Sequence, residues 1–136
     1  MFDALKLNHE AVVEEEEAIR NRVRAMDDLQ KRAYHSAFKK KMKDPDTYAV
    51  LNYFFVAGLH HIYLDKYARG LLNMGVMLGG LILLATPAFP LGILLILGLV
   101  TIELMALFRS QIVVTDHNNK LARALLEKLD NEQFST

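Results

Sequence analysis

Residues 70–108 read GLLNMGVMLGGLILLATPAFPLGILLILGLVTIELMALF, and Glu103 is the only charged residue among them. A helix needs roughly 17–25 mostly apolar residues to cross the hydrocarbon core of a bilayer. The stretches 70–86 and 91–108 meet that length. Between them, residues 87–90 begin and end with proline, which interrupts a helix and predicts a tight turn. This region therefore predicts a helical hairpin in a membrane.

The charges of the chain lie mostly outside this region. The chain has 16 basic and 16 acidic side chains, and between residues 48 and 108 only four are charged: Asp65, Lys66, Arg69 and Glu103. A water-soluble helical protein carries polar residues on every surface helix, whereas a chain whose middle faces lipid concentrates them at its ends. With 136 residues and no cysteine, the chain has room for one compact unit without disulfides. The predicted fold class is all-α, a helical integral membrane protein.

A further apolar segment, residues 48–64, makes the expected number of membrane helices two to three. Four of its residues interrupt the apolar run: Asn52, Gly58, His60 and His61. Lys66 and Arg69 before the hairpin and Arg109 after it place both hairpin ends inside by the positive-inside rule. If 48–64 also crosses, one terminus lies outside. The expected membrane domain covers residues 47–109, with segments at 48–64, 70–86 and 91–108.

The segment before the membrane domain, residues 1–46, predicts a charged amphipathic helix. Apolar residues recur at spacings of three, four and seven from Val12 to Phe38, a narrow stripe that needs a partner helix. No apolar signal sequence is visible, so we expect the N-terminus to be cytoplasmic. The expected membrane is the bacterial inner (plasma) membrane. Four lysines next to the membrane domain are expected to bind anionic lipid headgroups: Lys39, Lys40, Lys41 and Lys43.

Residues 110–136 predict a C-terminal amphipathic helix and a tail. The last membrane helix is expected to continue through Val113 and to end at residues 116–119, Asp-His-Asn-Asn, which are weak helix formers. A short helix over 120–129 then places three leucines on one face: Leu121, Leu125 and Leu129. Three turns are marginal alone in water, so we expect this helix to dock on the N-terminal helix, on another copy or on the bilayer.

Residues 58–65 read Gly-Leu-His-His-Ile-Tyr-Leu-Asp and close the first apolar segment. This stretch resembles the signature of the TM2 domain family, an apolar segment ending in Gly-x-His-Arg-Phe-Tyr-Leu-Gly, followed by a glycine and by a second apolar segment with an aspartate. The matching residues are Gly58, His60, Tyr63, Leu64 and Gly70, with Glu103 in the place of the aspartate. His61, Ile62 and Asp65 depart from the signature, and the interval from Gly70 to Glu103 is longer than in the family. The resemblance covers roughly residues 45–108, implies a membrane-embedded helical module and brings no activity with it.

Glu103 is the residue at which a function is most expected. A carboxylate in a membrane helix is costly and usually faces the bundle interior, where it pairs with another polar group. Two interpretations stay open: a buried structural hydrogen bond, for example to His60, or a proton or cation relay with His60 or His61. The two histidines are adjacent and point to different faces of a helix, so at most one is expected to meet Glu103. His60, Glu103 and Asp65 lack a short ligand spacing, so no metal site is predicted, and no cofactor or catalytic residue either.

Gly75 and Gly79 lie four residues apart and predict a face on which another helix packs closely, either in the hairpin or in a second chain. The predicted function is a non-enzymatic membrane scaffold or interaction module of TM2 type that forms a homo-oligomer. Its partners would be membrane lipids and a protein bound through the N-terminal helix. The alternative is a small channel or transporter subunit with Glu103 and His60 in a polar path. No nucleotide fingerprint is present and the basic segment adjoins a membrane, so neither an enzyme nor a nucleic-acid-binding protein is predicted.

Overall fold

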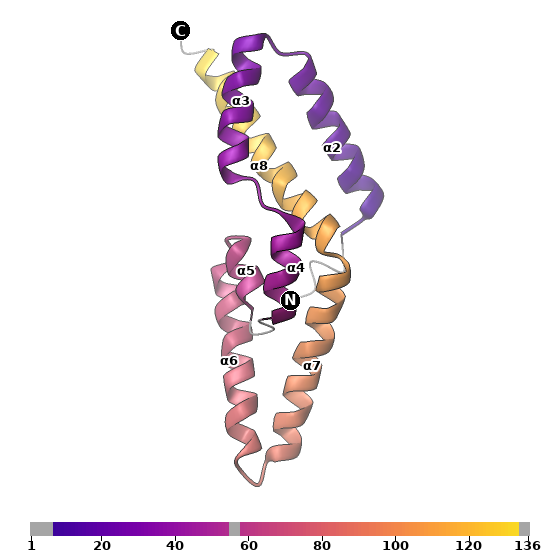
Figure 1. Cartoon of the computed structure of the whole chain (residues 1–136), viewed down its shortest axis with the longest axis vertical. Helices are drawn as coiled ribbons and strands as arrows, with labels where there is room; N and C mark the ends of the chain where they lie inside the picture. Colours follow the sequence, from indigo (N-terminus) through magenta and orange to yellow (C-terminus); the bar gives the residue numbers. More distant parts are fainter. Residues whose placement is uncertain (1–6, 55–57, 134–136) are drawn as a thin grey trace. The chain divides into compact units, whose positions relative to one another are not determined.

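The computed structural model describes residues 7–54 and 58–133, and every regular element in these residues is a helix (Figure 1). The helices are α2 (His9–Arg24), α3 (Asp28–Lys41), α4 (Pro45–Phe54), α5 (Leu59–Tyr63), α6 (Tyr67–Leu84), α7 (Phe89–Phe108) and α8 (Ser110–Gln133). The all-helical fold class is therefore confirmed. The chain forms two compact units where one was expected: residues 44–111, and residues 7–43 with 112–133. The second unit exists because the two charged flanks pack on each other.

Helices α6 and α7 form a hairpin in the first unit, and both begin slightly earlier than the sequence predicted. Pro90 lies in the first turn of α7, where the missing N–H of proline has no helical partner to lose. The connection is therefore residues 85–88. Thr86 stabilises it, because its hydroxyl donates to the carbonyl oxygen of Leu83 and accepts from the N–H of Ala88.

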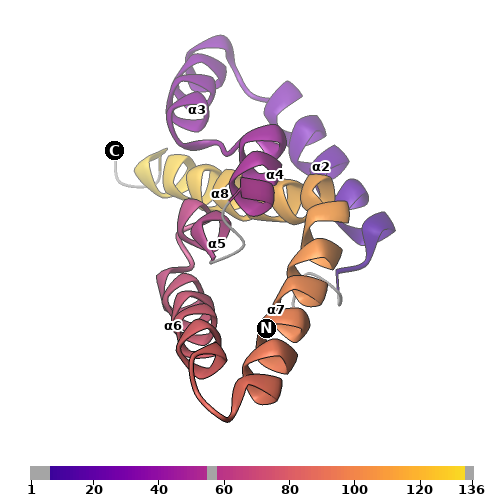
Figure 2. The ribbon, with the colours of Figure 1, turned by 60° about the horizontal axis from the view of Figure 1, so that its bottom comes forward.

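Near this turn the two helices approach each other closely through Gly80 and Gly92. A Cβ on Gly92 would lie 2.7 Å from the carbonyl oxygen of Gly80, and one on Gly80 would lie 2.7 Å from Cγ1 of Ile96. Away from the turn α6 and α7 diverge, and α4 and α5 lie between their other ends (Figures 1 and 2). Gly75 and Gly79 do not serve this contact, because a Cβ on either would have no described atom within 4 Å.

Both hairpin helices are long and apolar enough to cross a membrane. α6 has 18 residues and α7 has 20, yet only 17% and 22% of their apolar windows are buried. A core helix of a soluble protein would be mostly buried, whereas these two expose many large apolar side chains. Those side chains are Leu71, Leu72, Leu78, Leu81, Ile82, Leu84, Phe89, Leu91, Ile93, Leu94, Leu95, Leu97, Leu104, Met105 and Phe108.

The segment 48–64 is not one continuous helix. α4 ends at Phe54, and α5, a little more than one turn long, begins at Leu59 after Gly58, whose φ is 99°. A left-handed residue breaks the helical path, and glycine adopts this conformation without the strain that a Cβ causes. With 10 and 5 residues, α4 and α5 are too short to span a bilayer. The described residues therefore contain two candidate spans and not three.

In the second unit, helices α2, α3 and α8 pack around a small core of Val23, Tyr34, Ala122 and Leu126. The prediction of a single N-terminal helix through residues 12–38 is wrong, because the helix is interrupted between α2 and α3. Asp27 caps α3 by accepting from the N–H of Gln30, while the Gln30 side chain accepts from the N–H of Asp27. The break changes the buried face: Tyr34 is buried, and burial raises its pKa, whereas Leu29 of the predicted stripe is 80% exposed.

The last membrane helix was expected to continue through Val113 and to end at residues 116–119, and this prediction is wrong. α7 ends at Phe108, and a separate helix, α8, begins at Ser110 and runs through residues 116–119. The amides of this stretch bond to other parts of the second unit. Asn118 exchanges two 2.9 Å hydrogen bonds with the backbone of Lys43, and Asn119 donates to the carbonyl oxygen of Val12. These bonds offset the weak helix preference of asparagine, because they attach α8 to the N-terminal segment. Of the three docking options for the C-terminal helix, the structure has the contact with the N-terminal helices.

Candidate functional site

Glu103 of α7 lies inside the first unit and is 2% exposed. Asn52 of α4 donates a 3.0 Å hydrogen bond to the backbone carbonyl oxygen of Glu103, and Asn73 of α6 donates to its carboxylate Oε1. Both amides are buried as well, with 2% and 3% exposure. The sequence prediction did not include either asparagine in a site. The available signal was an amide in each of two apolar segments, since a buried amide requires a hydrogen-bonding partner.

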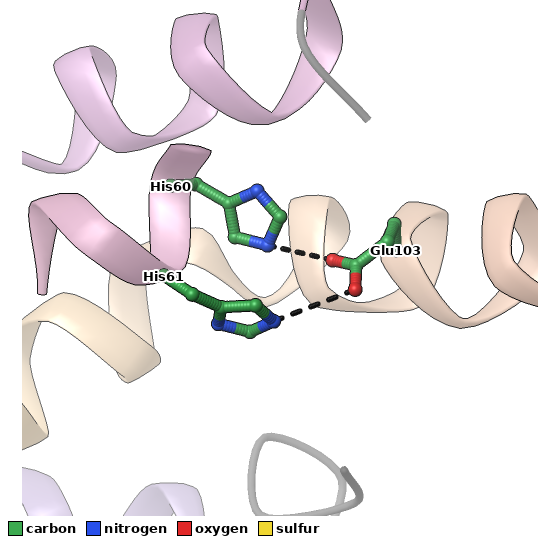
Figure 3. Close-up of side chains that lie close together, drawn as sticks. All are labelled: His60, His61 and Glu103. Carbon is green, nitrogen blue, oxygen red and sulfur yellow. Dashed lines mark ion pairs between the residues drawn. The ribbon is translucent and has the colours of Figure 1, made fainter. Parts of the chain in front are cut away.

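Two histidines of α5 reach the same carboxylate (Figure 3). Nε2 of His60 lies 2.6 Å from Oε2 of Glu103, and Nε2 of His61 lies 3.4 Å from Oε1. The prediction that at most one histidine meets Glu103 is therefore wrong. Adjacent helical residues point about 100° apart, but the imidazoles are long enough to converge, and their ring centroids are 4.2 Å apart. The carboxylate takes one imidazole on each oxygen.

Close backbone packing between α5 and α6 sets this geometry. A Cβ on Gly58 would lie 2.8 Å from the carbonyl oxygen of Gly70, and a Cβ on Gly70 would lie 2.5 Å from Cγ1 of Ile62. Larger residues at either glycine would push the short helix away from α6. The absence of side chains here therefore lets α5 lie where His60 and His61 face α7.

The start of α4 is attached to the end of α5. The hydroxyl of Tyr63 accepts a 2.8 Å hydrogen bond from the N–H of Asp44. The Asp44 carboxylate caps α4 by accepting from the N–H and the hydroxyl of Thr47, over 2.7 and 2.8 Å. These hydrogen bonds, the one from the Thr47 N–H first, hold the pKa of Asp44 below its ordinary value. The capped helix then places the ring of Tyr48 edge-on to that of His60, with centroids 5.2 Å apart.

The residues that match the TM2 signature all lie in this neighbourhood: Gly58, His60, Tyr63, Leu64, Gly70 and Glu103. Leu64 is 2% exposed and closes the end of α5. Asp65, which stands where the signature has glycine, has a φ of 61°. Glycine adopts this left-handed conformation most readily, and aspartate and asparagine tolerate it better than other residues do. The departure at Asp65 therefore keeps a backbone conformation that glycine would favour.

A carboxylate between two imidazoles can hold a shared proton or a metal ion. His60 and Glu103 are closed off from solvent, whereas the His61 side chain is 14% exposed. One ligand atom from each of the three residues lies within 4.8 Å of the others, a spacing suited to a metal ion. Asp65, which was considered with His60 and Glu103 as a possible ligand set in the sequence, is exposed and is not one of these three residues.

The other residues predicted to have a role are not members of this cluster. Gly75 and Gly79 face open space on α6. Lys39, Lys40 and Lys41 are exposed in the last turn of α3, and Lys43 is partly buried.

The second unit also contains a groove of about 530 Å³ between α2, α3 and α8. Its lining combines apolar side chains with charged ones. They include Ile19, Val23, Tyr34 and Phe38, and Glu16, Arg20, Arg24 and Lys31.

Comparisons of the chain with known protein families, with characterised proteins and with solved structures found no match.

Proposed function

We propose that this chain is a non-enzymatic integral membrane protein of TM2 type that acts as a homo-oligomeric scaffold or interaction module. The observation that carries the proposal is the apolar surface of the hairpin. Fewer than a quarter of the residues in the apolar windows of α6 and α7 are buried. In water, such a surface would be strongly unfavourable at about 25 cal/mol for each Å² of apolar area. In a bilayer the same apolar surface faces the hydrocarbon chains of the lipids, where it is favourable.

The arrangement of the TM2-like residues supports membership of this type. The matching residues lie around Glu103 and at the contact between α5 and α6. A Cβ on Gly58 or on Gly70 would lie less than 3.0 Å from a neighbouring atom. The substitution at Asp65 preserves a left-handed backbone.

The homo-oligomer is supported by the open face of α6. Gly75 and Gly79 lie one turn apart and have no described atom within 4 Å of a Cβ position, so a second helix can approach the backbone there. Leu72 and Ile82 flank them on the same side of the helix and are 58% and 67% exposed. A second copy of α6 is the proposed occupant of this face.

Orientation follows from the flanks. The exposed lysines at 39–41 would bind anionic headgroups of the inner leaflet of the bacterial inner membrane and keep the N-terminus in the cytoplasm. The groove of the second unit would then be available to a cytoplasmic protein.

The first experiment tests whether the chain is in the membrane. Membranes from expressing cells are washed with alkaline carbonate, and the chain is expected to stay in the pellet. Release of the folded chain into the supernatant would contradict integral insertion.

The second experiment tests the oligomer by cross-linking in native membranes. Wild type is expected to give dimers or higher species, and Gly75→Leu with Gly79→Leu is expected to reduce them strongly. Gly98→Leu is the matched control, because Gly98 is an outward-facing glycine of α7 with no described atom within 4 Å of its Cβ position. Monomer alone in wild type, or equal cross-linking in the double variant, would contradict the proposal.

A channel or transporter subunit is the second candidate, favoured by the buried group of His60 and Glu103. The two threonines of the hairpin, Thr86 and Thr101, do not extend a polar path from this group, because their hydroxyls bond to the backbone of their own helices. Thr86 donates to the carbonyl oxygen of Leu83, and Thr101 donates to that of Leu97 over 2.8 Å. Proton or ion flux into liposomes separates the two candidates: flux with wild type that is lost in Glu103→Gln would favour transport over the scaffold.

A further inference from the structure

We propose that His60, His61 and Glu103 bind a divalent transition-metal ion, with zinc as the closest chemical fit. Nitrogen ligands from two imidazoles and an oxygen from one carboxylate converge within 4.8 Å of one another. Zn²⁺ binds such sets, three protein ligands leaving one position for water. Mg²⁺ and Ca²⁺ prefer all-oxygen sites, so the two imidazoles argue against them.

The hydrogen bonding of His60 points to a ligand at this place. His60 is completely buried, and neither of its ring nitrogens has a hydrogen-bond partner among the described residues. Oε2 of Glu103 is buried and equally without one. The two atoms face each other at 2.6 Å, the distance of an ion pair. Buried polar atoms almost always have partners, and a bound cation would satisfy both.

The distances suit an ion after a small adjustment. Two ligand atoms on a tetrahedral zinc ion, each about 2.0–2.1 Å from it, are about 3.3 Å apart. The separation of His61 Nε2 and Glu103 Oε1, 3.4 Å, already has this value. His60 faces the other oxygen of the carboxylate, and the 2.6 Å separation of its Nε2 from Oε2 is too short for an ion bound to both atoms, so it would have to widen.

The residues around the three ligands hold them in place, as the outer shell of a metal site does. Asn73 donates to Oε1 of Glu103, and Asn52 donates to the Glu103 backbone oxygen. The ring of Tyr48 packs edge-on to His60. These contacts leave His61 as the ligand on the accessible side, so the ion would enter there and carry its water there.

The site is tested by metal binding to the full chain, purified in mild detergent with a tag that contains no histidine. After treatment with a chelator, the chain is titrated with Zn²⁺ and with Co²⁺. One equivalent of metal per chain is expected, and the cobalt form is expected to show the strong visible absorption of tetrahedral Co²⁺ with nitrogen and oxygen ligands. Zn²⁺ should also raise the midpoint of thermal unfolding, since a ligand that binds only the folded state stabilises it.

The variants distinguish this site from metal bound elsewhere. His61→Ala removes a partly exposed ligand, and Glu103→Gln keeps the shape of the side chain. Loss of an outer-shell partner weakens metal binding about 10–100-fold, so loss of a ligand should weaken it at least about 100-fold. His35→Ala, at an exposed histidine of α3, is the control and should bind as wild type does. Circular dichroism verifies that each variant keeps its helices.

Three results would overturn the proposal. The first is wild type that binds less than one equivalent of Zn²⁺ at micromolar concentration. The second is a cobalt spectrum typical of six-coordinate, solvated metal. The third is equal affinity in wild type and in folded His61→Ala. Each would show that His60, His61 and Glu103 do not form the metal site, and none depends on whether the chain forms an oligomer.

Discussion

Asn52 and Asn73 form a matched pair of residues that reports the charge on Glu103. Both side chains are almost fully buried, and each donates one amide hydrogen bond to Glu103. Substitution by alanine removes the same atoms from each. The two bonds differ in their acceptor, which is the carboxylate for Asn73 and the backbone carbonyl oxygen for Asn52.

We expect Asn73→Ala to lower the free energy of unfolding by about 1 kcal/mol more than Asn52→Ala does. A hydrogen bond to a charged group contributes about 1.5–3 kcal/mol and a neutral one about 0.5–1.5 kcal/mol. The truncation leaves a similar space at both sites, so that contribution cancels in the difference. The backbone oxygen of Glu103 can also keep its helical hydrogen bond after Asn52 is shortened, whereas the carboxylate loses a donor outright.

The assay is reversible unfolding in mixed micelles, with denaturing detergent as the titrant and far-UV circular dichroism as the signal. Glu103→Gln provides the control, because a neutral acceptor should reduce the difference between the two asparagine variants to nearly zero. Equal losses from Asn52→Ala and Asn73→Ala in the wild-type background would refute the reasoning, since they would mean that Glu103 is neutral and protonated.

Three further predictions concern the backbone and the caps. Gly92→Ala should be about 1–3 kcal/mol less stable than Gly98→Ala, because both gain helix preference but only Gly92 meets a backbone oxygen at 2.7 Å; micelle unfolding measures this. Asp65→Gly should be about 1 kcal/mol more stable than Asp65→Ala, since both lack the carboxylate and only alanine is strained at a φ of 61°; equal stability would contradict it. The pKa of Asp44 is lowered in the folded chain by the Thr47 hydrogen bonds, so the stability from this cap is present above about pH 4 and is lost as the pH falls further. Asp44→Asn, which caps without ionising, should show a smaller loss on acidification, and an unchanged loss would contradict the assignment.

The hairpin was predictable from the sequence because its determinants are local. Length, apolar composition and a proline-bounded turn are properties of a continuous stretch, and they identified two apolar helices within a few residues of 67–84 and 89–108. The boundaries shifted because Pro90 fits the first turn of a helix as well as it fits a loop.

The cluster at Glu103 was only partly predictable because it depends on contacts between distant segments. The sequence indicated that Glu103 would pair with a polar group, and His60 was among the candidates. The convergence of His61 was not predicted because residues 48–64 were expected to form one long helix. Gly58 breaks that helix, and the short α5 then takes a direction set by its contact with Gly70. No periodicity in the sequence carries this information.

The flanks show how tertiary contacts override local preference. Asp-His-Asn-Asn at 116–119 is a weak helix former, yet α8 continues through it because Asn118 and Asn119 find backbone partners in the N-terminal segment. The capping box of Asp27 had the opposite effect and divided a periodic stripe into two helices. Its sequence signal is an Asp followed three residues later by Gln, which is typical of a helix start.

Helices α6 and α7 contact each other at two places with different chemistry. This difference decides which end of the hairpin can open. Near the turn, Gly80 and Gly92 pack by shape alone, so that contact is insensitive to protons and metal ions. Toward the open end, Asn73 and Glu103 lie about 8 Å in from the helix ends by the rise of 1.5 Å per residue. There the contact between α6 and α7 runs through a carboxylate and its partners, and its strength depends on what His60 and Glu103 bind. Protonation or metal loss at the cluster should therefore loosen the open end while the turn end stays packed.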